Sequence, residues 1–206
     1  GQTRTETATE RQPSSDTPTP ASSSVRYRDN FSYNSYQSHW TIREGHDGSI
    51  ISVDIEDGQL VHIVDGGSVG GNIVSNQSCD SSATVKIETE LVRRLGGGGF
   101  GIHFGEYGTE SSVLIGDGEN SGLFYTVFPS DDRRGIVVDS EPGPENTPVT
   151  YSLTLDFNNQ TLQEISRDGR AYSLRVNFGD VFSDFFKIEI GNGRNHRIEY
   201  NYVEIK

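Results

Sequence analysis

The sequence predicts an all-β protein built as a two-sheet antiparallel β-sandwich, and three observations support this prediction. Residues 149–157 alternate between apolar and polar side chains, which is the period of two shown by a strand with one buried and one solvated face. No stretch of comparable length has the 3.6-residue period of an amphipathic helix. The chain also contains 24 glycines and only 32% hydrophobic residues, which suits many turns and sheets that each wet one face.

Residues 1–28 are predicted to be a flexible linker or tether outside the sandwich. They are rich in Ser, Thr and Pro, so they bury too little to offset the entropy lost on ordering. Segments of this kind often tether exported domains to a lipid anchor, a wall or another domain. The alternative is an arm that docks on a neighbouring subunit by strand addition. The sandwich is expected over residues 29–206 as one domain, because sandwiches of ~200–250 residues are common.

Turn residues divide the first part of this domain into short strands. The turn Glu56-Asp-Gly58 separates two of them, and the glycines at 96–99 predict a hairpin loop. Residues 123–128 are apolar on both faces, so we expect that strand to be central and covered on both sides. Strands are predicted over residues 50–56, 59–64, 71–75, 83–93, 100–104, 112–115, 122–128 and 135–139.

The last third of the domain predicts an antiparallel meander. Asp168-Gly169 is a strong two-residue hairpin signal, and Asn158-Asn159 marks the turn before it. Residues 172–178 repeat the clean alternation of residues 149–157. Strands are predicted over residues 149–157, 161–166, 172–178, 186–190 and 196–206.

Composition argues against several classes of partner and site. A net charge of −13 would repel a phosphate backbone or an anionic membrane surface. Cys79 is the single cysteine, so neither an intrachain disulfide nor a cysteine zinc cluster can form. No apolar run approaches the ~18 residues that span a bilayer. The absence of methionine leads us to expect that residue 1 is not a native start and that the chain has been either processed or shortened.

Four segments occur in an order and spacing that resemble one family. Asp29-Asn-Phe31 followed by Trp40 looks like an opening strand with its packed tryptophan, and residues 55–61, 153–169 and 197–205 look like later paired strands. The chain from about residue 29 to 206 thereby resembles the concanavalin A-like lectin and glucanase superfamily, which includes laminin-G-like modules. The resemblance implies a jelly roll of two large sheets, with a curved face and loops that often bind glycans.

The acids that catalysis requires in the glucanases of this superfamily are missing. Those enzymes carry Glu-x-Asp-x-x-Glu on one strand, whereas this chain offers only Glu88 and Glu90 beside Lys86. Retaining hydrolysis needs two carboxyl groups ~5 Å apart across a sugar, which neighbours on one strand face rarely provide. Gly66-Gly-Ser68-Val-Gly70 matches a serine nucleophile motif, but no helix follows it. We therefore assign no catalytic residue and expect a solvated, charged strand face at Glu88 and Glu90.

The loops offer candidate ligand-binding residues. Sugar sites combine an aromatic platform with polar side chains that bond to hydroxyl groups. The candidates are Tyr107, Asp117, Glu119, Asn120, Asp131, Asp132, Arg133 and Arg134. Asp117 and Glu119 also resemble the first half of a calcium loop, although Phe128 at the twelfth position excludes an EF-hand. Calcium, held with another loop such as Asp131-Asp132, is the one candidate cofactor, and an ordinary acidic turn is the alternative.

These observations predict a non-catalytic, exported module that binds carbohydrate or another surface polymer. We expect it outside the cell or on the cell surface, with a glycan or cell-surface polymer as partner and no nucleic acid. Two alternatives stay open. One is a structural or adhesive subunit that assembles through protein contacts, including a homo-oligomer formed through the N-terminal arm. The other is a glycan-processing hydrolase.

Overall fold

A computed structural model describes residues 27–33, 36–43, 50–66, 71–76, 79–80, 84–95, 100–104, 113–119, 121–127, 135–178, 185–192 and 196–206. Most of the predicted linker, residues 1–26, lies outside these residues. Tyr27 and Arg28, which we had assigned to the linker, belong to the first strand. That strand pairs with the last strand of the same chain.

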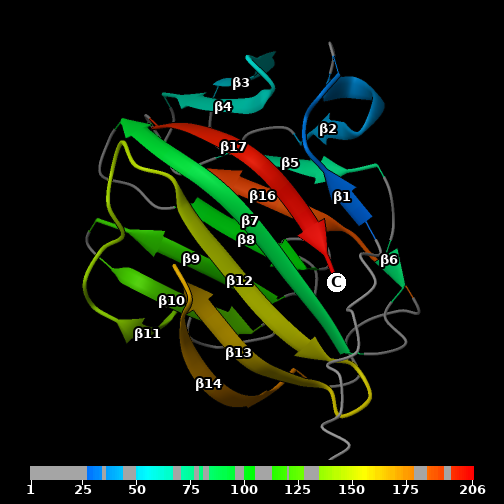
Figure 1. The fold of residues 1–206 in the computed structure, drawn as a ribbon, viewed down its shortest axis with the longest axis vertical. Helices are drawn as coiled ribbons and strands as arrows, with labels where there is room; N and C mark the ends of the chain where they lie inside the picture. Colours follow the sequence, from blue (N-terminus) through cyan, green and yellow to red (C-terminus); the bar gives the residue numbers. More distant parts are fainter. Residues whose placement is uncertain are drawn as a thin grey trace, which may run out of the picture.

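Two antiparallel sheets form the sandwich, stacked one over the other (Figure 1). The eight-stranded sheet runs in the order β14 (Arg170–Asn177), β13 (Thr161–Arg167), β12 (Val149–Asp156), β7 (Thr84–Leu95), β17 (His196–Ile205), β4 (Gln59–Asp65) and β3 (Ile50–Glu56), with β1 (Tyr27–Asp29) also paired to β17. The seven-stranded sheet runs β11 (Ile136–Asp139), β10 (Gly122–Val127), β9 (Val113–Gly118), β8 (Phe100–Phe104), β16 (Ile188–Asn192), β5 (Gly71–Ser75) and β2 (Trp40–Ile42).

The described elements confirm the predicted all-β class. A two-stranded pair, β6 (Cys79–Asp80) with β15 (Phe185–Phe186), and a short 3-10 helix η1 (Tyr36–Ser38) complete the list. Every strand pair in the two large sheets is antiparallel. No helix within the described ranges has the length and apolar character needed to cross a membrane.

Most predicted strands are confirmed with small shifts at their ends, and three expectations are corrected. The strand predicted over residues 186–190 is divided: Phe186 belongs to β15, which pairs with β6, and β16 starts at Ile188. β9 extends to Gly118, so Asp117 lies within a strand and not in a turn. β10 is not central: only β11 lies between it and the edge of its sheet. The apolar residues on both faces of β10 therefore need an explanation other than a central position.

The core lies between the sheets, where the inward positions of both sets of strands meet. Its largest fully buried side chains include Trp40, Tyr151, Tyr200 and Phe31. Trp40 is packed as the sequence predicted, with its ring centroid 6.3 Å from that of Phe31. Its indole Nε1 donates a 2.9 Å hydrogen bond to the buried carboxylate of Asp29. The opening strand is thereby fixed to the core.

Candidate functional site

The outer face of the seven-stranded sheet can be read from its register. Ile190, Ile115 and Tyr125 are buried core residues on β16, β9 and β10, so they point inward. Residues next to them along each strand point to the opposite face, because side chains alternate. One row of such outward residues crosses five adjacent strands: Asn72, Gly191, Gly101, Gly116 and Phe124.

Three residues of this row are glycines on neighbouring strands, and we name Gly191, Gly101 and Gly116 the glycine row. Gly191 pairs with Gly101, and Gly101 pairs with Gly116. Glycine inside a strand weakens it and often marks a place where a ligand or another backbone comes close. Three in register leave a strip of the face without side chains.

The β5 side of the glycine row is polar. Asn72 Nδ2 donates a 2.5 Å hydrogen bond to Glu189 Oε1, and Arg43 Nη1 lies 3.3 Å from Glu189 Oε2. The Arg43 backbone N–H also donates to the Asn72 carbonyl at 2.9 Å, which fixes β2 beside β5 here. Glu189 is 1% exposed, so its charge is sheltered and held by these partners. We name Arg43, Asn72 and Glu189 the polar cluster.

The β10 side of the glycine row is apolar. Phe124 is half-buried and packs against Gly135, where any Cβ would collide with its ring. Val137 pairs with Phe124 on the edge strand β11 and is 49% exposed. Thr126, two residues along β10, is buried, and its Oγ1 has no hydrogen-bond partner among the described residues. The second apolar face of β10, which suggested a central strand, therefore borders this site.

This arrangement has the chemistry of a polyol site. An aromatic ring stacks on the C–H face of a sugar, and planar amide, carboxylate and guanidinium groups bond to its hydroxyls. The glycine row between them carries no side chains, which is a condition for a flat ring to approach the backbone. We take the glycine row, the polar cluster and Phe124 as the candidate site.

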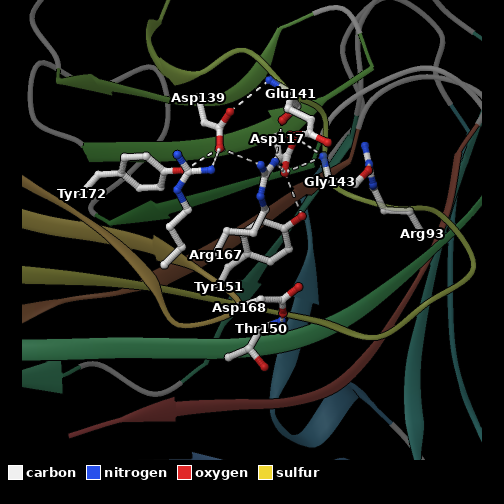
Figure 2. Close-up of polar contacts among 11 residues, drawn as sticks. Arg93, Asp117, Asp139, Glu141, Gly143, Thr150, Tyr151, Arg167, Asp168 and Tyr172 are labelled. Carbon is white, nitrogen blue, oxygen red and sulfur yellow. Dashed lines mark hydrogen bonds and ion pairs between the residues drawn. The ribbon is translucent and has the colours of Figure 1, made fainter.

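A second polar arrangement lies inside the sandwich, around Asp117 (Figure 2). Asp117 is fully buried, and its carboxylate accepts hydrogen bonds from Tyr151 Oη at 2.9 Å and Arg167 Nη1 at 2.9 Å. Both of its oxygens also lie 3.1 Å from the Gly143 backbone N–H, which donates to them. Burial and the neighbouring Asp117 carboxylate raise the pKa of Tyr151. The Tyr151 hydroxyl therefore stays a donor at physiological pH.

Arg167 extends this arrangement to the surface. Its Nη2 donates to Asp139 Oδ2 at 2.9 Å, and Tyr172 donates its hydroxyl to the same oxygen. The hydrogen bond from Tyr172 and the nearby guanidinium groups hold the pKa of Asp139 below its usual value. Burial works against the charge of Arg167, but the bond to Asp117 keeps its pKa above the usual value. These groups are therefore ionised and paired.

Of the residues predicted to bind a ligand, the structure describes only Asp117 and Glu119. Asp117 faces the interior and Glu119 is exposed, so the structure does not bring the two carboxylates to one site. The other candidates, Tyr107, Asn120, Asp131, Asp132, Arg133 and Arg134, lie outside the described residues. Their role remains a prediction.

The strand topology also separates the predicted residues into two groups. Asp117 lies near the turn that joins β9 to β10, whereas residues 128–134 follow the far end of β10. The described residues contain no group of three or more His, Cys, Asp or Glu side chains placed to hold a metal ion. The Asp117 carboxylate is moreover occupied by Arg167 and Tyr151. Calcium at Asp117 and Glu119 therefore gains no support from the geometry.

Glu88 and Glu90 lie on the outer face of the eight-stranded sheet, as expected. Glu88 is 3.5 Å from Lys86 Nζ and 3.3 Å from Lys206 Nζ, and it accepts a 3.0 Å hydrogen bond from Tyr202 Oη. Burial alone would raise the pKa of Glu88, but Tyr202 and Lys206 lower it below the usual value. An acid catalyst needs a raised pKa, so Glu88 is poorly suited to that role.

The sequence analysis missed the glycine row, the polar cluster and Phe124. Gly101, Gly116 and Gly191 each lie inside a strand next to an apolar residue, and a glycine within a strand is a local signal of a bulge or a close approach. Their alignment, however, depends on the pairing of β16, β8 and β9, which a single sequence does not give.

Comparisons with known proteins bear on this fold. No protein-family model matches the chain, and no curated protein does either. The carbohydrate recognition domain of Emp46p in its potassium-bound form matches with a TM-score of 0.59 and 15% identity, over 85% of this chain and 93% of that one. The lectin UEA-II, complexed with galactose, matches with a TM-score of 0.62 and 9% identity, over 89% and 99% of the two chains.

A third match is a structure described under endo-acting O-glycanases of the human gut microbiota. Its TM-score is 0.62 at 14% identity, over 88% of this chain and 98% of that chain. The chain has a lectin-type fold. This supports the sequence resemblance to concanavalin A-like proteins, and at such identities the likeness concerns the fold alone.

Proposed function

We propose that this chain is a non-catalytic carbohydrate-binding module whose sugar lies on the outer face of the seven-stranded sheet. The observation that carries the proposal is the glycine row between Phe124 on one side and the polar cluster on the other. The lectin-type fold supports it, since Emp46p is described as a carbohydrate recognition domain and UEA-II was solved with galactose.

Each part of the site has a defined role. A pyranose ring lies over the glycine row with its C–H face against Phe124. The amide of Asn72, which the buried Glu189 and its partner Arg43 hold in place, bonds to ring hydroxyls. The hydroxyl of Thr126, two residues from Phe124 on β10, has no partner among the described residues and offers one further donor and acceptor. Tyr107 and residues 131–134, which flank the described ends of β8 and β10, are proposed as additional contacts.

The proposed setting is the cell exterior or surface. Residues 1–26 serve as the Ser/Thr/Pro-rich tether in this proposal, because their composition favours an extended, solvated segment. The net charge of −13 favours a polar glycan or surface polymer over nucleic acid.

A broad glycan array followed by calorimetry tests this function. Phe124→Ala and Gly116→Val should each weaken binding of any array hit at least tenfold, because one removes the platform and the other fills the strip. Tyr202→Ala, a half-buried aromatic change on the outer face of the other sheet, is the matched control and should leave binding unchanged. Circular dichroism confirms folding of each variant. If the wild-type protein binds no glycan on the arrays and no polysaccharide in pull-downs, the proposal is rejected.

A second candidate function, assembly through protein contacts, rests on edge strand β11. Ile136 is 60% exposed and Val137 49% exposed, and β11 is an edge strand among the described strands, where another chain can pair. Light scattering after size exclusion should then show a dimer that Ile136→Lys with Val137→Lys converts to a monomer. A wild-type monomer at all concentrations would exclude this candidate.

A further inference from the structure

Arg93 is a cation that points into the sandwich. On β7 the residues Val85, Ile87, Thr89, Leu91 and Arg93 occupy alternate positions and are all buried, so they share the inward face. Arg93 is 3% exposed. Moving a charged group out of water costs several kcal/mol unless it is paired and hydrogen-bonded. The guanidinium of Arg93 therefore needs a counter-charge.

The protein supplies Arg93 with little compensation. Its Nη2 donates to the carbonyl of Gly143, while Nε and Nη1 have no hydrogen-bond partner among the described residues. Arg167, in the same region, is paired with both Asp117 and Asp139. Figure 2 shows Arg93 on the far side of Gly143 from Arg167. Among the described residues, Arg167 therefore has carboxylate partners and Arg93 has none.

No carboxylate among the described residues pairs with Arg93. The Asp117 carboxylate accepts hydrogen bonds from Tyr151, Arg167 and the Gly143 N–H, and Arg93 donates to the carbonyl oxygen of the same glycine. Arg167 pairs with Asp117 and Asp139, and Arg170 pairs with Asp139, whereas Arg93 has no ion pair among the described residues. The charge of Arg93 is therefore not balanced by a contacting carboxylate.

We propose that Arg93 is the core of an internal anion site, which binds one small monovalent anion of the halide class against Nε or Nη1. The site lies beneath the segment 140–148, in which Gly143 is buried and the other residues are exposed. An anion there supplies the counter-charge that Arg93 lacks and accepts hydrogen bonds from its Nε or Nη1. It also strengthens the hold of Arg93 on Gly143, the one buried residue of the segment that connects β11 to β12.

This site is separate from the proposed sugar site. Arg93 lies on the inward face of the eight-stranded sheet, whereas the glycine row lies on the outer face of the seven-stranded sheet. Anion binding can therefore be present or absent whatever glycan the protein binds.

Thermal unfolding under anion exchange tests the proposal. Chloride or bromide replaces a bulky sulfonate buffer anion at constant ionic strength and pH. A ligand that binds only the native state at ten times its dissociation constant should raise the melting temperature of a protein of this size by about 3–6 °C, along a saturating curve. Arg93→Gln and Arg93→Met should abolish the rise. Arg170→Gln, which removes a side chain that is 70% exposed, is the matched control and should keep it.

A crystallographic measurement keeps the test decisive if the Arg93 variants do not fold. Wild-type crystals grown in bromide should show an anomalous peak in hydrogen-bond contact with the Arg93 guanidinium. The absence of such a peak, with only water in that position, would overturn the proposal. So would halide stabilisation that is equal in the wild type and in a folded Arg93 variant.

Discussion

Arg167 Nη1 lies 2.9 Å from Asp117 Oδ2, and this ion pair joins the two sheets of the sandwich. Arg167 belongs to β13 of the eight-stranded sheet and Asp117 to β9 of the seven-stranded sheet. The Asp117 side chain is fully buried and that of Arg167 is 11% exposed, so solvent screens the pair weakly. An ion pair between the sheets constrains their relative position more than apolar contacts do, because its hydrogen bonds are directional.

Removing one partner of this pair should be costly. Arg167→Met leaves the buried Asp117 carboxylate without a cation, and breaking a buried pair in this way costs about 3–5 kcal/mol. Urea unfolding should show this loss as a lower midpoint at an unchanged slope. Arg170→Met is the control: its pair with Asp139 is exposed, so the loss should stay below about 1 kcal/mol. Equal losses in the two variants would contradict the role given to Arg167.

Gly143 should be irreplaceable for a steric reason. A Cβ at this position would lie 2.5 Å from both Asp117 Oδ2 and Tyr151 Oη, and these atoms are fixed by their own hydrogen bonds. Gly143→Ala should therefore destabilise the protein by about 1–3 kcal/mol through overpacking. Pro144→Ala, an exposed change at the next residue, should have a much smaller effect. Differential scanning calorimetry compares the melting temperatures of the two variants. An unchanged melting temperature for Gly143→Ala would refute the steric requirement for glycine at this position.

The fold was more predictable than the site, and particular residues show why. The strand from Val149 to Asp156 has a period of two that is visible locally, and turn glycines mark its neighbours. Asp117 was misplaced because Asp-Gly is a common turn signal, whereas pairing of Gly118 with Gly122 extends the strand past it. The glycine row depends on partners far apart in sequence, so local pattern could not reveal it. Arg93 carried one signal: a charge at an inward position of an alternating strand.

His62 should make stability depend on pH in a defined window. It is fully buried on β4, and burial lowers its pKa to about 3 from the ordinary 6.5. The unfolded chain then binds a proton between about pH 6.5 and 3 that the folded chain excludes, so stability falls as pH drops through this range. The expected slope is about 1.4 kcal/mol per pH unit. Urea unfolding of wild type and His62→Phe from pH 7 to 4.5 measures it.

The pH range from 6.5 to 4.5, in which His62 affects stability, lies above the range in which the carboxylates do so. Glu88, Glu199 and Asp139 have lowered pKa values in the folded state, so their stabilisation is present above about pH 4.5 and is lost below it. A slope in His62→Phe equal to that of the wild type between pH 6.5 and 4.5 would show that His62 does not cause it.

Asp29 should be the residue on which the opening strand depends. Its Oδ1 accepts the Phe31 N–H at 2.9 Å, and its Oδ2 accepts Trp40 Nε1 at 2.9 Å and Tyr33 Oη at 2.8 Å. Phe31 has a φ of 54°, an unfavourable backbone angle for an aromatic residue, which the bond from its N–H helps to hold.

Asp29→Asn replaces one of these acceptor oxygens by an N–H₂ group that cannot accept. The buried N–H of Trp40 or of Phe31 then loses its partner, at a cost of about 1–3 kcal/mol. Fluorescence of Trp40, the single tryptophan, reports unfolding in urea and should show the midpoint shift. Asp57→Asn, in an exposed turn with a φ of 50° that asparagine tolerates, should move the midpoint by a few tenths of a kcal/mol at most. If Asp29→Asn unfolds at the wild-type midpoint, the carboxylate does not anchor the strand, and the packing of Trp40 on Phe31 must account for its position alone.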